Sequence, residues 1–390
     1  MAGSRAGSVL SAGEARAAER LLTRAWDEPV MIRAADVIWD RRHVVRLHLD
    51  TGRSAVLKRQ REKGRRRRWP AFGVELAVLD YLNAMPVPVA PRLLGADSGA
   101  GVLVMEDLGE GSSLADSLLR GGRARVQAEL IAYARALGSL HAWSMGHAAE
   151  FAELWRRHDP GAELRTRWLD AIQRGTQPFL SAVATLGVAV DGVADEIDEL
   201  RAMLTGPDYL GLVHGDPCPD NVQMIDGACR IFDFEISGWG PVAFDAAYLL
   251  APFPSCWCFA DLPADVAGPA VDAYRAQLEA GGISLRPDWD DLTTAVLAGL
   301  IIARGPVLGR VLDDDPDWGT TTMRPRLLAW LRSFTGRAGD GTLPRLQATA
   351  GAVRDRLSAR WPGLRVPQYP ALAEAGSVLA RVPDGWQSRP

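Results

Sequence analysis

Three polar side chains between Leu212 and Tyr248 have the types and spacing of a phosphoryl-transfer site. Asp216 follows a His-Gly pair, Asn221 comes five positions later, and Asp233 follows the next strand-like run. An aspartate can accept the proton of an attacking hydroxyl, and amide and carboxylate oxygens are the ligands that Mg²⁺ prefers. The spacing therefore predicts a catalytic base and two magnesium ligands that act on the γ-phosphate of ATP.

Lys58 is one of only two lysines among the 44 basic side chains. It ends a strand-like run, where a compact ammonium suits the α- and β-phosphates of a nucleotide better than a guanidinium does. A lysine retained in so arginine-rich a chain is a candidate phosphate-binding residue, with chance placement as the alternative. Glu75 lies early in a predicted helix, where it either orients Lys58 or is an exposed acid.

The elements around these residues suit a small sheet followed by a helical region. Apolar and polar residues alternate in the run 43–50, as in a half-buried strand. The run 101–105 leads into a charged crossover that contains glycine. The predicted strands span 31–39, 43–50, 54–60, 92–94 and 101–105, and the predicted helices span 12–25, 71–84, 113–119, 125–143, 150–157, 161–173, 177–188, 192–205, 263–280, 289–313, 321–334 and 343–360.

The order of these features along the chain predicts an α+β fold of the protein kinase-like, two-lobe type. The order is a lysine, a glutamate, a crossover, several helices, and then the two aspartates with their asparagine. In this order the polar residues would form one ATP site between the two lobes. We expect residues 1–107 to form an N-terminal nucleotide-binding lobe with a leading helix and an antiparallel sheet. Residues 108–390 would form a mostly helical lobe with the catalytic loop and the acceptor site.

Two motifs resemble the aminoglycoside phosphotransferase and choline kinase-like family. They are HGDPCPDN, which begins at His214, and FDFE, which contains Asp233. The run LGSLHAW at 137–143 and the DAAY run at Asp245 are similar to that family too. The resemblance covers roughly residues 30–335, and it implies a kinase-like fold and transfer from ATP to an alcohol.

The resemblance also implies a role for each matching residue. Asp216 corresponds to the catalytic base, and Asn221 and Asp233 correspond to the Mg²⁺ ligands. Lys58 would hold the α- and β-phosphates, and Glu75 would orient it.

Four further residues take supporting roles by the same resemblance. The backbone groups of Glu106 and Leu108 would bind the adenine edge. His214 would order the catalytic loop through hydrogen bonds, and Asp245 would anchor its backbone.

The turn expected to cover the nucleotide departs from the family pattern. It falls at 39–43 and contains no glycine, whereas a glycine-rich loop lets backbone N–H groups approach the phosphates. Either Arg41 or Arg42 contacts phosphate instead, or nucleotide binding is weak, or the donor is not ATP. A non-catalytic pseudokinase scaffold is the alternative from another class, although it would have no need for the full set of catalytic residues.

The acceptor surface is expected on the helical lobe. An acidic run beside aromatic residues would suit a cationic alcohol such as an aminoglycoside-like antibiotic, an amino sugar or an amino alcohol, unless the run is a solvated loop. A second hypothesis is a Ser/Thr peptide kinase that works with a partner enzyme. Residues 335–390 would then provide additional docking surface. The candidate lining residues are Asp159, Glu163, Trp168, Ser255–Phe259, Arg304 and the acidic run Asp313–Trp318.

Composition excludes several classes of protein. The 390 residues are 47% hydrophobic and 24% charged, with a net charge of −4, which gives no basis for nucleic-acid binding. The basic run 63–68 is interpreted as a solvated loop rather than a nucleic-acid contact. No apolar run is long enough for a membrane span or a signal peptide, so we expect a cytoplasmic protein without a membrane partner. The sequence makes no prediction of the oligomeric state.

The cysteines predict no disulfide framework. There are four, and they are few and clustered, which favours a reducing compartment. Cys256 and Cys258 are separated by one residue rather than the two of a zinc knuckle. A role as small buried hydrophobes is favoured over a metal site.

Overall fold

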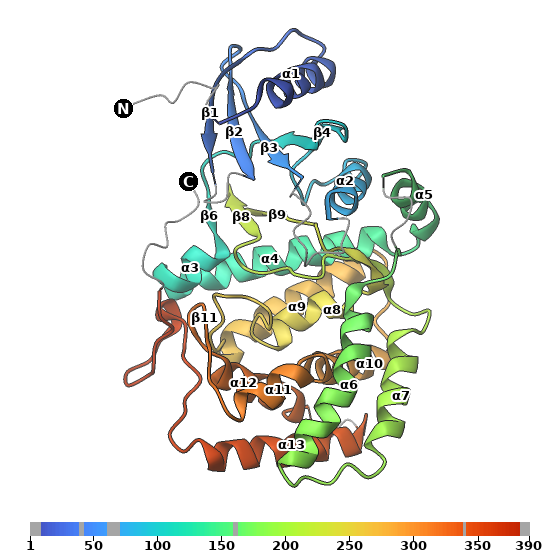
Figure 1. Ribbon diagram of the computed structural model, residues 1–390, viewed down its shortest axis with the longest axis vertical. Coiled ribbons are helices and arrows are strands. Elements are labelled where there is room, and N and C mark those ends of the chain that lie inside the picture. The colour runs from blue at the N-terminus through green and yellow to red at the C-terminus, as the bar shows by residue number, and fades with distance from the viewer. Residues whose placement is uncertain (1–8, 39–42, 61–70, 159–162, 338–340, 383–390) are drawn as a thin grey trace.

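The computed structural model describes residues 9–38, 43–60, 71–158, 163–337 and 341–382. Figure 1 shows a small lobe that contains a sheet above a larger lobe built of helices. The predicted α+β fold with two lobes is confirmed. Three predictions fall outside the described residues: the turn at 39–42, the basic run 63–68, and Asp159.

The small lobe is a five-stranded antiparallel sheet in the order β1-β2-β3-β5-β4. Alternate residues of β2, from Val45 to Leu49, are buried against the first helix, as the sequence alternation predicts. That helix begins with a capping box, in which Ser11 and Glu14 exchange hydrogen bonds of 2.7 and 3.2 Å. The elements of the small lobe are α1 (Ala12–Trp26), β1 (Ile32–Val37), β2 (Val44–Leu49), β3 (Ser54–Arg59), α2 (Ala71–Leu82), β4 (Leu93–Asp97) and β5 (Val102–Glu106).

Two small sheets lie where the lobes meet and frame the catalytic stretch. One has the order β6-β8-β9, and the other pairs β10 with β7. The loop 214–221 runs from β7 to β8, and the loop 232–237 runs from β9 to β10, so the two short sheets bring these loops together. The strands are β6 (Ser112–Ser113), β7 (Leu210–Val213), β8 (Val222–Ile225), β9 (Ala228–Ile231) and β10 (Gly238–Pro241).

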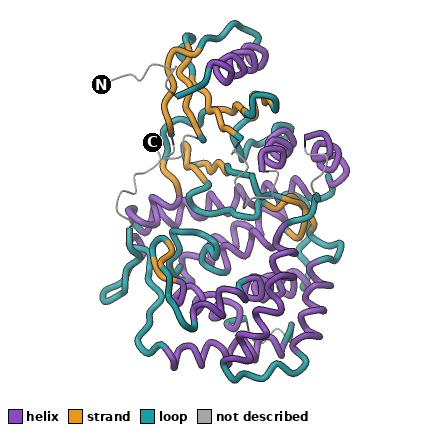
Figure 2. The backbone as a smooth tube through the Cα atoms, in the orientation of Figure 1, coloured by secondary structure: helices purple, strands orange, loops and turns teal. Residues whose placement is uncertain are grey.

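The large lobe consists mainly of helices, as the purple segments of Figure 2 show. One hydrophobic core runs from α2 through this lobe, while a second lies between α1 and the sheet. The elements are α3 (Leu114–Arg120), α4 (Arg123–Ser144), α5 (Ala148–His158), α6 (Arg167–Thr185), α7 (Val193–Leu204), α8 (Ala243–Leu250), α9 (Ala264–Ala280), α10 (Asp288–Ala303), α11 (Gly305–Val311), β11 (Asp317–Trp318), β12 (Thr321–Thr322), α12 (Met323–Thr335), α13 (Pro344–Arg360) and the 3₁₀ turn η2 (Pro370–Leu372).

Three predicted helices were wrong in their extent. The helices expected at 161–173 and 177–188 are one helix, α6, which continues through Pro178. Its buried residues recur with helical spacing from Trp168 to Val183, and this packing offsets the hydrogen bond that a proline cannot donate. The helix expected at 289–313 is instead two, α10 and α11, which bend by 51° at Arg304. Pro306 accounts for the bend because its ring opposes continuation of the preceding turn.

The structure contradicts the expectation of unpaired cysteines. A disulfide joins Cys218 in the catalytic loop to Cys256 in the loop after α8. Cys229 and Cys258 are free and buried, in keeping with a role as small hydrophobes. Composition did not reveal the pair because 38 residues separate the two cysteines and only the fold brings them together. The inference of a reducing compartment thereby loses its support.

The described part of the C-terminal tail packs on the large lobe. Gln368 forms bridges to Asp261 and Leu379, and Tyr369 is fully buried. Among the described residues no single helix is long and apolar enough to cross a membrane. Among the same residues, only α10 and α11, when taken together as one bent pair, reach the length and the apolar composition that a span requires.

Candidate active site

Asp245 anchors the catalytic loop from its buried side. Its carboxylate accepts the backbone N–H groups of His214 at 2.6 Å and Gly215 at 3.0 Å. On the same side, Nε2 of His141 lies 3.2 Å from the carboxylate, and its Nδ1 lies 2.8 Å from the hydroxyl of Tyr274. Asp245 and His141 are both fully buried. This network fixes the start of the loop without using any group that substrate could reach.

His214 links the two loops that carry the acidic residues. Its Nδ1 accepts the N–H of Asp216 at 3.2 Å, so Nε2 carries the proton and donates to the carbonyl of Phe232 at 3.0 Å. Asn221 closes the loop by donating its amide N–H to the carbonyl of Asp216 at 3.0 Å. The amide oxygen of Asn221 thereby stays available to a ligand, next to the segment that carries Asp233.

Asp216 is held by one of its two carboxylate oxygens. Oδ1 accepts a short hydrogen bond from Ser255, and the hydroxyl of Tyr248 lies 2.6 Å from Ser255 and 3.2 Å from the same Oδ1. Oδ2 accepts no hydrogen bond from the described residues. The side chain is therefore oriented while one oxygen remains for a substrate hydroxyl.

Sequence reasoning missed this pair of hydroxyls. Tyr248 was noted only as the end of the DAAY run, and Ser255 only as a candidate lining residue. Ser255 lies 39 positions from Asp216, and no short spacing connects the two. The disulfide between Cys218 and Cys256 was the missing signal, because it brings the Ser255 segment against the loop.

Lys58, Glu75 and Asp233 come from three different segments and meet in the cleft between the lobes. Nζ of Lys58 lies 2.7 Å from Glu75 Oε2 and 2.5 Å from Asp233 Oδ1. Burial lowers the pKa of Lys58, but the two carboxylates outweigh it, so its pKa lies above the ordinary value. Burial raises the pKa of Glu75 more than Lys58 lowers it, to about 7. The lysine therefore stays charged between two acids.

Asp233 occupies the left-handed region of the backbone, with φ of +69°. A non-glycine residue there costs on the order of 1 kcal/mol. Such a conformation persists where the surroundings impose it, and here it turns the carboxylate toward Lys58. With Asn221, Asp233 supplies an amide and a carboxylate oxygen, which is the hard donor set that suits Mg²⁺.

A cavity of about 160 Å³ adjoins Lys58 under the sheet. The linker after β5 forms one wall and is fixed by Asp107, which pairs with Arg46 at 2.8 Å and accepts the N–H of Gly109 at 3.0 Å. The N–H of Glu106 already donates to Arg92. Leu108 makes no backbone hydrogen bond to the described residues, so its N–H and C=O remain for a ligand. Apolar side chains complete the walls: Ile38, Val44, Val56, Met105 and Phe232.

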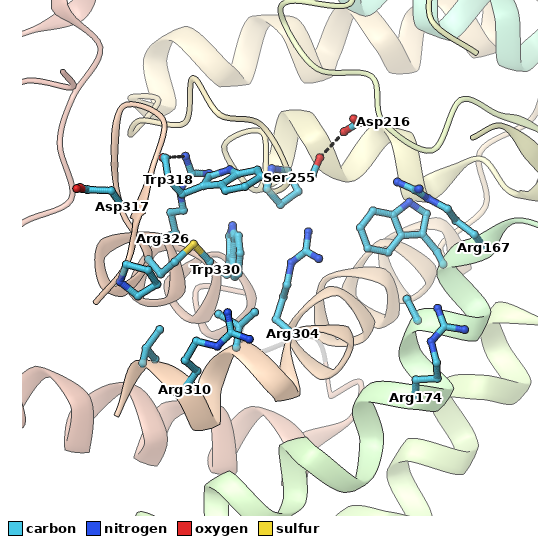
Figure 3. A pocket seen from close by; sticks show the side chains of 17 residues that line it. Arg167, Arg174, Asp216, Ser255, Arg304, Arg310, Asp317, Trp318, Arg326 and Trp330 are labelled. Carbon is cyan, nitrogen blue, oxygen red and sulfur yellow. Dashed lines mark hydrogen bonds between the residues drawn. The ribbon is translucent and has the colours of Figure 1, made fainter. Parts of the chain in front are cut away.

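A larger cavity, of about 730 Å³, opens on the other side of Asp216. Figure 3 shows Asp216 and Ser255 at its edge, with Arg304 rising into its middle. Of the expected acceptor residues, six line it: Trp168, Ser255, Arg304, Pro316, Asp317 and Trp318. The cavity is lined by Arg167, Trp168, Ala171, Arg174, Asp216, Pro254, Ser255, Arg304, Val307, Arg310, Val311, Pro316, Asp317, Trp318, Met323, Arg326 and Trp330.

The other expected acceptor residues lie elsewhere. Glu163 is exposed and pairs with Arg165. Asp313 and Asp314 are exposed, and Asp315 accepts the N–H of Arg324 near the start of α12. Cys256, Cys258 and Phe259 are buried, and Trp257 donates its indole N–H to Asp220 at 2.8 Å. The aspartates of the acidic run are therefore mostly solvated, and Asp317 is the one of them that lines the cavity, beside Pro316 and Trp318.

Backbone contact between α6 and the α10/α11 bend shapes this cavity. A Cβ on Gly175 would lie 2.1 Å from the carbonyl oxygen of Ile302, and one on Gly305 would lie 2.4 Å from that of Gly175. The two glycines therefore allow α6 to touch the bend, which brings Arg304 beside the α6 face. The indole N–H of Trp168 donates to the carbonyl of Gly215 at 3.1 Å and ties this face to the catalytic loop.

Comparison with known proteins gives a family match and several structural likenesses. The profile of the phosphotransferase enzyme family (APH) matches residues 34–292, from β1 into α10. Comparison with curated protein sequences gives no match.

Three solved structures illustrate the structural likeness. An aminoglycoside phosphotransferase from Alicyclobacillus acidocaldarius is 15% identical, with a TM-score of 0.46 and coverage of 84% of this chain and 93% of that one. A macrolide 2'-phosphotransferase from Brachybacterium faecium is 16% identical, with a TM-score of 0.46 and coverage of 76% and 94%. A choline/ethanolamine kinase family protein from Mesorhizobium loti is 17% identical, with a TM-score of 0.42 and coverage of 88% and 99%.

Proposed function

The chain belongs to the phosphotransferase enzyme family, and we propose that it moves the γ-phosphoryl group of ATP, with Mg²⁺, to a hydroxyl of a small molecule. The observation that carries the proposal is the position of Asp216. One of its carboxylate oxygens is held by Ser255 and the other is unbonded among the described residues, and the side chain borders a cavity large enough for a drug-sized acceptor.

In the proposed reaction Asp216 orients the acceptor hydroxyl and accepts its proton. The acceptor oxygen forms a bond to the γ-phosphorus as the bond to the β–γ bridging oxygen breaks, and ADP leaves. Lys58 holds the α- and β-phosphates with Glu75 behind it, and Asn221 and Asp233 hold Mg²⁺, which neutralises charge on the phosphates when bound. Lys58 must release Asp233 for this, because the two are paired in the nucleotide-free structure.

The backbone of Leu108 is proposed to bind the adenine edge, with Glu106 beside it in the linker. His214 and Asp245 then act only by holding the catalytic loop. We place the boundary between the nucleotide-binding lobe, residues 1–107, and the helical lobe, residues 108–390, in this linker. A cytoplasmic location, which would let the enzyme draw on cellular ATP, stays part of the proposal.

Two other readings are less well supported. A cavity of about 730 Å³ suits a compact acceptor better than an extended Ser/Thr peptide. A pseudokinase scaffold would have no need of Lys58 paired with both Glu75 and Asp233.

Nucleotide binding and transfer test the proposal together. ATP titrated into the protein by calorimetry should bind in the presence of Mg²⁺ and much less in EDTA. Lys58→Met should weaken binding, and Lys58→Arg should not restore it, because a guanidinium does not replace a compact ammonium between two carboxylates. Mass spectrometry of a mixed panel of alcohols should show one product gaining HPO₃, absent with Asp233→Asn. ATP affinity unchanged in Lys58→Met, with no product from any acceptor, would refute the function.

A further inference from the structure

The acceptor cavity is lined by five arginines and only two aspartates. This balance is the reverse of what the acidic run in the sequence suggests. The aspartates compensate for the arginines only in part, through the favourable interaction of Asp216 with Arg304. Asp216 faces the reaction, and Asp317 pairs with Arg381 and points away from the cavity in Figure 3.

One of the five arginines is already committed to the fold. Arg326 is almost completely buried and donates to the carbonyls of Cys256, Trp257 and Trp318 at 2.6, 3.0 and 2.9 Å. It fastens the β11–β12 hairpin to the loop after α8. Arg326 therefore builds the wall of the cavity and is not counted among the groups that could bind an acceptor.

Three other arginines of the lining have guanidinium groups that no described residue pairs with. Within the described ranges, the side chains of Arg174, Arg304 and Arg310 make no ion pair and no hydrogen bond. Arg174 and Arg310 are exposed at the mouth of the cavity, on α6 and α11. In Figure 3 both side chains lie below Arg304, on opposite sides of the opening.

Arg304 is the deepest of the three. Its Cζ lies 5.6 Å from the ring centre of Trp168 and 5.3 Å from that of Trp330, so the guanidinium is flanked by two indoles. Burial lowers its pKa from the ordinary value. A partly desolvated cation costs free energy until a counter-charge reaches it. No carboxylate of the described chain pairs with it, so the counter-charge is expected from a ligand.

The planar fork of an arginine matches the oxygens of a carboxylate or a phosphate with two parallel hydrogen bonds. Trp318, at the rim, exposes about half of its surface, 51%, and offers an apolar face to the rest of a ligand. The cavity thus has an anion-binding floor, a flat apolar rim and a base at its edge.

Given the phosphotransferase activity proposed above, on which this step depends, we propose that the acceptor is an anionic alcohol. Its carboxylate or phosphate group binds Arg304, with Arg174 and Arg310 at the mouth, while its hydroxyl reaches Oδ2 of Asp216. Transfer converts this alcohol and ATP into a phosphate monoester and ADP, and the proton passes to Asp216 and then to solvent. A polycationic acceptor such as an aminoglycoside would face repulsion from the same three arginines.

Binding of matched compounds tests the charge preference. One set is glucose, glucosamine, glucuronate and glucose 6-phosphate, and a second is tyrosol, tyramine and 4-hydroxyphenylacetate. Calorimetry with the nucleotide cleft saturated by a non-hydrolysable ATP analogue and Mg²⁺ should show at least one anionic member binding tenfold or more tightly than its neutral and amino counterparts. Glucuronate and glucose 6-phosphate distinguish carboxylate from phosphate recognition.

Variants assign the preference to Arg304. Arg304→Gln should weaken binding of the preferred anion by roughly 10- to 100-fold, the range expected for charge-assisted hydrogen bonds. Arg304→Lys should retain part of the preference, because it keeps the charge but not the fork. Arg354→Gln, on α13 away from the cavity, is the matched control and should change nothing. Equal anion affinity in Arg304→Gln would overturn the proposal.

Transfer to the same compounds, measured separately with ATP and Mg²⁺ in place of the analogue, separates the two levels of inference. Phosphorylation of glucosamine or tyramine, but of no anionic member, would leave the phosphotransferase function standing and overturn the anionic acceptor. Anion binding that depends on Arg304, with no phosphate transferred to any compound, would support the anion site and count against the proposed function. Absence of binding by every anionic member would overturn the anionic acceptor outright.

Discussion

The two cavities on either side of Asp216 handle charge in opposite ways. On the nucleotide side, Lys58 is satisfied by Glu75 and Asp233, so this cleft is balanced before any ligand arrives. On the acceptor side, Arg304 lies between two indoles and forms no ion pair with a carboxylate of the described residues. A balanced site must rearrange its ion pairs to admit a ligand, whereas an unbalanced one gains its counter-charge from the ligand. The contrast indicates that discrimination by charge belongs to the acceptor cavity.

Asp216→Asn should have the largest effect on catalysis, since Asp216 is the proposed base at the edge of the acceptor cavity. The amide is nearly isosteric but cannot accept the proton, so kcat should fall by about 10²- to 10⁴-fold. Binding of nucleotide should change little, because Asp216 does not line the cavity beside Lys58. An anionic acceptor should still bind, because Arg174, Arg304 and Arg310 stay in place. Steady-state kinetics with calorimetry on each ligand checks this, and unchanged kcat would remove Asp216 from the chemistry.

Removing the disulfide should have the next largest effect, this time on stability. Replacing Cys218 and Cys256 together by serine should lower the free energy of unfolding by about 2–4 kcal/mol, since the bridge restrains the unfolded chain. Thermal unfolding with and without reductant checks it. The reductant should lower the melting temperature of the parent protein and leave that of the double variant unaltered. A parent protein indifferent to reductant would contradict the bridge.

Gly175→Ala should separate the two cavities. The added methyl meets the Ile302 carbonyl, and overpacking of this kind costs about 1–3 kcal/mol. Because the contact sets the position of Arg304, acceptor KM should rise while the affinity for ATP is retained. Gly351→Ala on α13 has nothing within 4 Å of the new methyl and should instead stabilise by about 0.5–1 kcal/mol. Equal stability of the two variants would refute the packing argument.

Ser255→Ala should have the smallest effect. It removes one hydrogen bond to Asp216 and leaves the charged residues of both cavities in place, so kcat should fall about tenfold, equivalent to about 1.4 kcal/mol. KM for ATP and for the acceptor should not move. Ser255→Thr should restore much of the rate because its hydroxyl can reach the same oxygen. A rise in acceptor KM with kcat unchanged would show that Ser255 binds substrate rather than positioning the base.

Much of the nucleotide side was predictable from the sequence. Val45, Leu47 and Leu49 alternate in a strand, and the turn after Asp50 leads directly to the strand that ends at Lys58. The predicted elements of the small lobe agree with the observed ones to within a few residues. Such elements depend on the periodicity of apolar residues over short stretches of the chain, which can be recognised from the sequence alone.

Helix ends on the acceptor side were less predictable. Pro178 suggests a break, yet α6 continues because its buried face packs along its whole length. Pro306 lies within a long apolar run that predicts one continuous helix, yet α10 ends and α11 begins next to it. In both places tertiary packing decided whether a proline interrupts the helix.

The sequence by itself determined the enzyme family of this protein, because the motifs around Asp216, Asn221 and Asp233 lie on two short loops whose spacing is local. Only the tertiary structure decided the character of the acceptor cavity. Arg174, Arg304 and Trp318 come from three distant segments, and a backbone contact through Gly175 brings the first two together. Charge in a cavity depends on which side chains the fold brings face to face, so the acidic run at 313–317, prominent in the sequence, lies mostly in solvent while scattered arginines surround the acceptor.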